Sequence, residues 1–156
     1  MQISYFCHDI SSPDAQRDAE AIQRFPQLAR KFVPEWQCST RPLDEDISAA
    51  ILNELALTDS FTSGAAAIAD FLFDHFGTMP RLVVCCDARS ELAIKAKTER
   101  PSAVWGAACP PLVAIYHHEP ALIWHELFHL LGAEDCYEIE GGGNVVRDCT
   151  CGHHNC

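Results

Sequence analysis

The chain has 156 residues, of which 48% are hydrophobic, so one domain of this size buries a substantial core. A formal net charge of −11 argues against nucleic acid or an anionic membrane as a partner, since both require clustered Lys and Arg. Residues 1–10 lack the features of a signal peptide, and no window approaches a membrane span. We therefore expect a cytoplasmic protein whose nine cysteines are reduced thiols or metal ligands.

The N-terminal part of the chain predicts strands that alternate with helices. Ile3–Cys7 is rich in β-branched and aromatic residues and predicts a strand. A helix is expected over Asp14–Phe32, with a kink or a division at Pro26. Glu35–Thr40 is a candidate second strand, and Ser48–Leu57 predicts a short helix.

The middle of the chain predicts a further helix and a buried strand. Apolar residues at helical spacing indicate a helix over Gly64–Phe76, with Thr62 or Ser63 as its N-cap. Leu82–Cys86 is a continuous apolar run, typical of a strand that is buried on both faces. The polar residues 88–101 predict a surface loop or a short helix.

Two strands and a helix follow. Ala103–Cys109 and Leu112–Tyr116 are separated by a tight turn and can pair antiparallel, and Pro120 suits the first position of a helix. Alternating strands and helices favour a mixed α/β fold. We expect a mostly parallel sheet with an antiparallel edge strand, packed on helices.

The segment HELFHLLGAED, residues 125–135, predicts a catalytic zinc site. His125 and His129 are four residues apart, so on a helix they share one face and can bind one ion. Gly132 can end that helix in a left-handed conformation, after which Asp135 can supply a third ligand. Three protein ligands leave a position for water, which is typical of a catalytic zinc. Glu126 lies between the histidines as a candidate general base.

The alternative is that the two histidines are an ordinary surface or core pair. The apolar helix around them, the glycine and the ligand-capable residue after it favour the zinc site. Glu134 is the nearest substitute for Asp135 as third ligand.

These residues resemble the HExxHxxGxxH/D signature of the metzincins, a clan of zinc endopeptidases. Aspartate in the third ligand position is similar to snapalysin-like enzymes, and a following cysteine, Cys136, is similar to archaemetzincins. The resemblance implies one catalytic domain over residues 1–156, with a metzincin-like mixed sheet, an edge strand above the cleft and an active-site helix below it. Residues 136–156 would form a tail rich in Cys and His.

Peptide hydrolysis by such a site follows from its ligands. Zinc lowers the pKa of bound water to about 7, and Glu126 would take the water's proton and pass it to the leaving amine. Gly106, Ala107 and Ala108 on the edge strand would let an extended peptide approach closely. The alternative is that these small residues only fill a tight sheet.

The tail contains a second group of candidate metal ligands. Thiolates at short spacing suit a structural zinc, and archaemetzincins are similar in carrying one with a C-x4-C-x-M segment; redox-active or idle thiols are the alternative. The chain ends with no methionine after the last cysteine, so we expect either a sequence that stops short of a metzincin Met-turn or a chain without one. The candidate ligands are Cys136, Cys149, Cys151 and Cys156, with His153 or His154 as replacements.

Three functions remain open at this point. The first is a zinc peptidase acting on a peptide or protein substrate. The second is a zinc hydrolase of small amides or esters, and the third is a zinc-binding protein without turnover, against which Glu126 speaks.

Overall fold

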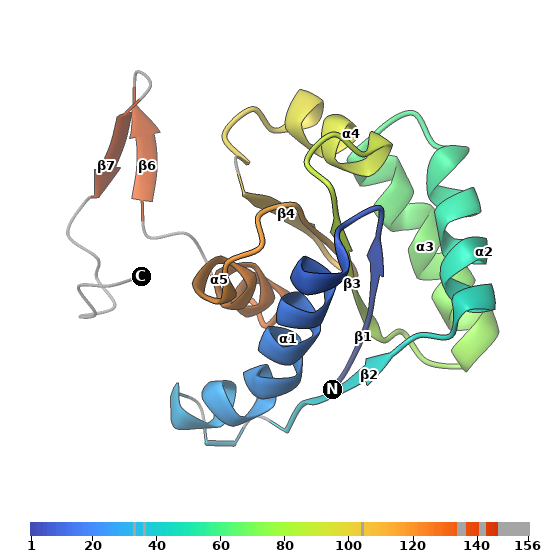
Figure 1. Ribbon diagram of the computed structural model, residues 1–156, viewed down its shortest axis with the longest axis horizontal. Coiled ribbons are helices and arrows are strands. Elements are labelled where there is room, and N and C mark those ends of the chain that lie inside the picture. The colour runs from blue at the N-terminus through green and yellow to red at the C-terminus, as the bar shows by residue number, and fades with distance from the viewer. Residues whose placement is uncertain (33, 36, 104, 134–136, 141–142, 147–156) are drawn as a thin grey trace.

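The computed structural model describes residues 1–156 except 33, 36, 104, 134–136, 141–142 and 147–156. Its helices and strands alternate along most of the chain (Figure 1). The helices are α1 (Ser12–Phe32), α2 (Glu45–Ala56), α3 (Phe61–Phe76), α4 (Glu91–Glu99) and α5 (Pro120–Leu130). The strands are β1 (Gln2–His8), β2 (Ser39–Pro42), β3 (Arg81–Cys86), β4 (Gly106–Cys109), β5 (Leu112–Ile115), β6 (Tyr137–Glu140) and β7 (Gly143–Val146).

The first five strands form one sheet in the order β2-β1-β3-β5-β4. β1 pairs parallel with β2 and β3, and β3 pairs parallel with β5. Only β4 is antiparallel, at the edge beside β5, with Gly106 opposite Ile115. β6 and β7 form a separate antiparallel pair. The protein is therefore a mixed α/β fold whose main sheet is mostly parallel, as expected.

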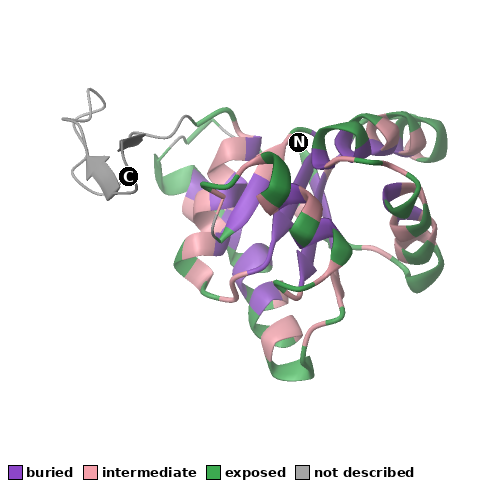
Figure 2. Cartoon of the chain, turned by 90° about the horizontal axis from the view of Figure 1, so that it is seen from above, coloured by how far each residue is buried: buried purple, intermediate pink, exposed green. Residues whose placement is uncertain are grey.

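Helices cover both faces of the main sheet, which is buried between them (Figure 2). α1 and α5 pack on one face, where the core contains Ile22, Phe25, Val83, Ile115 and Leu127. α2, α3 and α4 pack on the other face. Sheet strands covered on both sides have continuous apolar sequences, as in β3 and β5. None of the helices in the described part of the chain is long and apolar enough to cross a membrane.

Several predicted boundaries were wrong by a few residues. The second strand is Ser39–Pro42, not Glu35–Thr40, because its register with β1 brings the later residues opposite Gln2–Tyr5. The N-cap of α3 is Ser60, whose side chain accepts from the Ser63 backbone N–H while the Ser63 hydroxyl accepts from the Ser60 N–H. This reciprocal pair satisfies two donors, which a cap at Thr62 or Ser63 would leave to solvent.

Pro26 does not divide α1, which continues to Phe32. A proline inside a helix removes one hydrogen bond and costs about 3 kcal/mol or more. Buried residues on both sides of it, Phe25 and Ala29, hold the two halves of the helix against the sheet. Tertiary packing thus overrides the local signal.

Candidate metal centre

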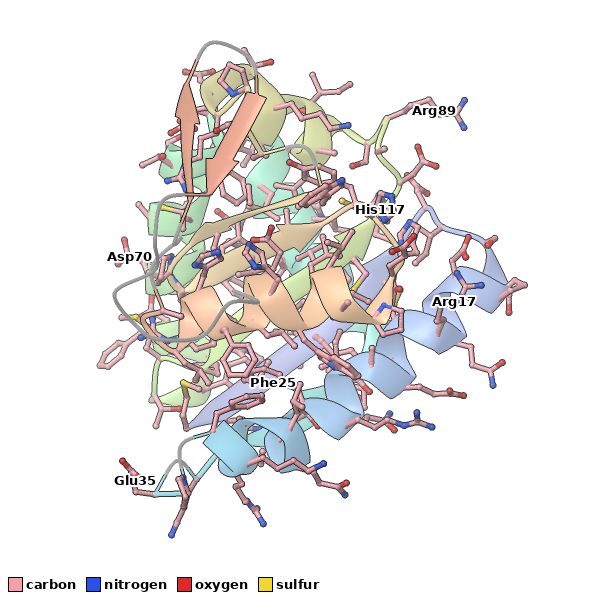
Figure 3. All side chains as sticks on the ribbon, turned by 90° about the vertical axis from the view of Figure 1, so that its left-hand side faces the viewer. Arg17, Phe25, Glu35, Asp70, Arg89 and His117 are labelled. Atoms are coloured by element: carbon pink, nitrogen blue, oxygen red, sulfur yellow. The ribbon has the colours of Figure 1, made fainter. Side chains whose placement is uncertain are left out.

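Three of the predicted site residues, His125, Glu126 and His129, lie on α5, which begins at Pro120 and packs one face against α1 and the sheet. Ile123, Leu127 and Leu130 are buried on that face. The indole N–H of Trp124 donates to the Ala21 carbonyl of α1 at 2.8 Å. Figure 3 shows Phe25 of α1 beside α5, where its ring makes an edge contact with Phe128 at a centroid distance of 5.1 Å. These contacts fix the rotation of α5.

The helix brings His125 and His129 together on one side. Their Nε2 atoms are 3.2 Å apart, and the two rings are almost perpendicular, at 89°. Two nitrogens bound to one tetrahedral zinc at 2.0–2.1 Å would be separated by about 3.3 Å. The spacing of the two imidazoles therefore fits two ligands of one zinc ion.

Gly132 shapes the turn that follows the helix. Its φ is +90°, a left-handed conformation that glycine adopts without cost. The Gly132 N–H donates to the His129 carbonyl at 3.0 Å, and the Ala133 N–H donates to the Phe128 carbonyl at 3.1 Å. These two bonds are those of a Schellman motif, so the predicted glycine turn is confirmed.

The same turn orients one of the histidines. The Ala133 carbonyl lies 2.8 Å from Nδ1 of His129. A carbonyl oxygen can only accept, so Nδ1 is the donor, which leaves Nε2, on the side of His125, as the ring nitrogen that can bind a metal. Metal-binding histidines are commonly oriented by such a hydrogen bond to a backbone carbonyl.

Glu126 projects toward the edge strand rather than into solvent. It is only 7% exposed. A Cβ added at Gly106 would lie 2.7 Å from its Cγ, 2.8 Å from its Cδ and 2.9 Å from its Oε1. Glycine at the start of β4 is therefore required for the carboxylate to pack against the strand backbone. The structure thus brings together Glu126 and one of the predicted substrate-binding residues.

Side chains bind the outer carbonyls of β4. The Tyr116 N–H donates to the Trp105 carbonyl, so by alternation the carbonyls of Gly106 and Ala108 face the outer edge. The Tyr116 hydroxyl donates to the carbonyls of Ala103 and Gly106, the latter at 3.2 Å. Arg100 Nη1 donates to the Ala108 carbonyl at 2.6 Å.

The pKa of Tyr116 also depends on the charge of the site. Its pKa is raised, chiefly by burial and then by the nearby negative charge of Glu126. The phenol therefore stays protonated and keeps its role as a donor to the strand.

The remaining predicted ligands lie outside the described residues. These are Asp135, with its substitute Glu134, and the tail residues Cys136, Cys149, Cys151, His153, His154 and Cys156. Within the part of the chain that the structure describes, no three His, Cys, Asp or Glu side chains form a cluster that could hold a metal ion. The described chain therefore supplies two nitrogens and a buried carboxylate, and the third ligand remains a prediction.

A hydrogen bond between a buried carboxylate and a histidine, which the sequence analysis missed, lies just before α5. Asp18 of α1 is fully buried and accepts from Nδ1 of His118 at 2.7 Å. Arg17 donates to the His118 carbonyl at 3.2 Å. A signal was present: Asp18 occupies an inward position of α1, four residues before Ile22, where an apolar residue is expected.

Comparisons of the chain with protein-family models, with curated proteins and with solved structures give no match. Any assignment of function to this site consequently depends on its own geometry and chemistry.

Proposed function

We propose that the protein is a zinc-dependent peptidase of the metzincin type. One observation carries the proposal. His125 and His129 are one helical turn apart, their Nε2 atoms lie 3.2 Å from each other, and the buried Glu126 stands between them in the sequence. These nitrogens fit a tetrahedral zinc, and Asp135 would be the third ligand. The topology also supports the proposal, because an antiparallel edge strand beside the HExxH helix is the layout that the resemblance implies.

The chain's own residues would perform the proton transfers. When bound, a zinc ion supplies a Lewis acid that activates water and polarises the scissile carbonyl. Glu126, held against the backbone of Gly106, accepts a proton from the attacking water and delivers it to the leaving amine. His129 keeps its orientation through the Ala133 carbonyl while these protons move.

The substrate would lie along the outer edge of β4. An extended peptide adds to an edge strand through main-chain hydrogen bonds. The strand starts directly at the glutamate, so a peptide bound along Gly106–Ala108 brings one of its carbonyls near the histidine pair.

One observation favours the second candidate, a hydrolase of small amides or esters. The edge carbonyls of Gly106 and Ala108 already accept from Tyr116 and Arg100. A peptide must use their second lone pairs or displace these donors, whereas a small substrate needs neither.

The test combines metal content and turnover in the full chain under reducing conditions. Glu126→Gln should retain zinc and lose on the order of a hundredfold to ten-thousandfold in turnover, because it removes the general base. His129→Gln should lose the catalytic zinc as well. The matched control is His75→Gln, which removes an exposed histidine from α3 and should change neither quantity.

The substrates and the metal count separate the candidates. Cleavage of an unbiased peptide library, with no hydrolysis of small esters, supports the peptidase, and the reverse result supports the second candidate. Zinc that is bound as tightly by His129→Gln as by the wild type contradicts both. A ratio of two zinc ions per chain, falling to one when the tail cysteines are changed to serine, supports the proposed structural ion at Cys136, Cys149, Cys151 and Cys156.

A further inference from the structure

Two cysteines face each other at the carboxyl ends of the central strands. The parallel register of β1 and β3 places Cys7 opposite Cys85. Both belong to the face of the sheet that packs on α1 and α5. Adjacent strands are about 4.8 Å apart, within the 4.4–6.8 Å that a disulfide requires between Cα atoms. The Cys7 thiol donates to the Ala15 carbonyl of α1 at 3.7 Å, so its sulfur lies on the α1 side of the sheet.

This pair lies where the winding of the sheet reverses. The helix after β1, α1, covers one face, and the helix after β3, α4, covers the other. In α/β sheets, the crevice outside the carboxyl ends of two such strands is the usual place for chemistry. The histidines proposed to bind zinc lie on α5, whereas the two cysteines lie on β1 and β3. The cysteine site therefore does not depend on the proposed function.

The two thiols have different environments. Cys7 is half-buried and Cys85 is fully buried. The hydrogen bond from Cys85 lowers the pKa of Cys7, against burial and the charge of Asp18. The same hydrogen bond and burial raise the pKa of Cys85 well above its usual range. Cys7 is therefore the more readily ionised, nucleophilic member of the pair.

A buried carboxylate stands beside the thiols. Asp18 accepts from His118 through Oδ2 at 2.7 Å, and its charge raises the pKa of both Cys7 and Cys85, which places the carboxylate near the pair. Its Oδ1 atom is buried without a hydrogen-bond partner among the described residues. An unsatisfied buried carboxylate oxygen is costly in an ordinary core, which indicates that it has a role as a proton acceptor.

Cys7 is the more accessible member of the pair. β2 pairs only with Gln2–Tyr5, so the carboxyl end of β1 has no neighbouring strand on that side. Cys7 is half-buried there, whereas Cys85 is fully buried. A small oxidant such as a hydroperoxide would therefore meet Cys7 first.

We propose that Cys7 and Cys85 are a hydroperoxide-reactive thiol pair that forms a reversible disulfide. The Cys7 thiolate attacks the outer oxygen of the peroxide; the O–O bond breaks, Cys7 becomes a sulfenic acid, and hydroxide or alkoxide leaves. Cys85 then gives its proton to Asp18 and attacks the Cys7 sulfur. The S–S bond forms as the S–O bond breaks, and the departing hydroxide becomes water. Two thiols are oxidised by two electrons and one peroxide is reduced.

The test treats the reduced full chain with stoichiometric hydrogen peroxide, blocks the remaining thiols and maps tryptic peptides without reduction. Cleavage after Arg17, Arg81 and Arg89 releases Cys7 in peptide 1–17, and Cys85 with Cys86 in peptide 82–89. The expected result is a disulfide between these two peptides that thiol reductants reverse.

Cys86→Ser is the matched control, because Cys86 is the chain neighbour of Cys85 but packs on the opposite face of the sheet. It should retain the linked peptides, whereas Cys85→Ser should lose them and accumulate a Cys7 sulfenic acid that dimedone traps. Asp18→Asn should slow disulfide formation by on the order of a hundredfold.

Two results overturn the proposal. One is a linked peptide that survives in Cys85→Ser. The other is Cys7 recovered as a free thiol when the other described cysteines are already oxidised. If Cys85→Ser does not fold by circular dichroism, fragmentation of the wild-type linked peptide decides between Cys85 and Cys86 directly.

Discussion

Replacing Gly132 by alanine tests whether the turn after α5 prepares the metal site. Gly132 has a φ of +90°, and an added Cβ would meet no atom within 4 Å, so the cost of alanine is conformational rather than steric crowding by neighbours. A left-handed alanine costs roughly 1–2 kcal/mol. In a domain of this size, each kcal/mol lowers Tm by about 2–4 °C.

The second effect of the change concerns the metal. If the turn rearranges, the Ala133 carbonyl moves away from Nδ1 of His129, which it now meets at 2.8 Å. Losing such a partner typically weakens metal affinity 10–100-fold, or about 1.4–2.7 kcal/mol. We therefore expect Gly132→Ala to lose both stability and zinc affinity.

Gly77→Ala is the matched control. Gly77 ends α3 in the same left-handed region, with φ +64°, and an added Cβ there also meets nothing within 4 Å. It should lose similar stability without any change in zinc affinity. Affinity is measured by competition with a chromophoric chelator, in a background whose tail cysteines are serine. If Gly132→Ala binds zinc as tightly as Gly77→Ala does, the turn does not organise His129 and the reasoning is refuted.

Three further changes probe the site and the packing around it. Gly106→Ala places a Cβ within 2.7–2.9 Å of the Glu126 side chain, so turnover should fall about a hundredfold with zinc retained; undiminished turnover would contradict the role of that contact. Hydrogen bonds from Thr62 lower the pKa of Glu99. This pair therefore stabilises the fold at any pH above the ordinary pKa of glutamate, and the stabilisation is lost as the pH falls through the lowered pKa of Glu99. Glu99→Gln should thus be less stable than wild type at pH 7, with the gap closing in acid; a gap that is independent of pH in urea titrations would exclude this linkage. Phe25→Ala empties a fully buried site and should cost about 3–5 kcal/mol by urea unfolding at pH 7, and a cost below about 1 kcal/mol would show that α1 repacks.

Much of the fold was predictable because its signals are local. The continuous apolar run of β3 indicates a strand that is covered on both faces, and the structure confirms that β3 is buried in this way. The helical spacing of His125 and His129 places them on one side of a helix, and the glycine three residues later predicts the turn. Each of these inferences depends on the period of a single element or on the conformational freedom of one residue.

Local signals failed where contacts with residues distant in the chain determine the register or the extent of an element. The register of β2 follows from its hydrogen bonds to β1, in which Ser39 pairs with Gln2, about 37 residues earlier. The helix α1 continues through Pro26 because it packs on the sheet. A period within one segment carries no information about such contacts.

The same division holds for the functional residues. The sequence by itself determined the spacing of the two histidines around Glu126. Only the tertiary structure placed that carboxylate against Gly106, buried Asp18 beside His118, and set Cys7 opposite Cys85. The members of these three pairs are 20, 78 and 100 residues apart in sequence for Gly106 and Glu126, Cys7 and Cys85, and Asp18 and His118. Their proximity arises from the burial of apolar faces on both sides of one sheet, a property of the whole chain rather than of any segment.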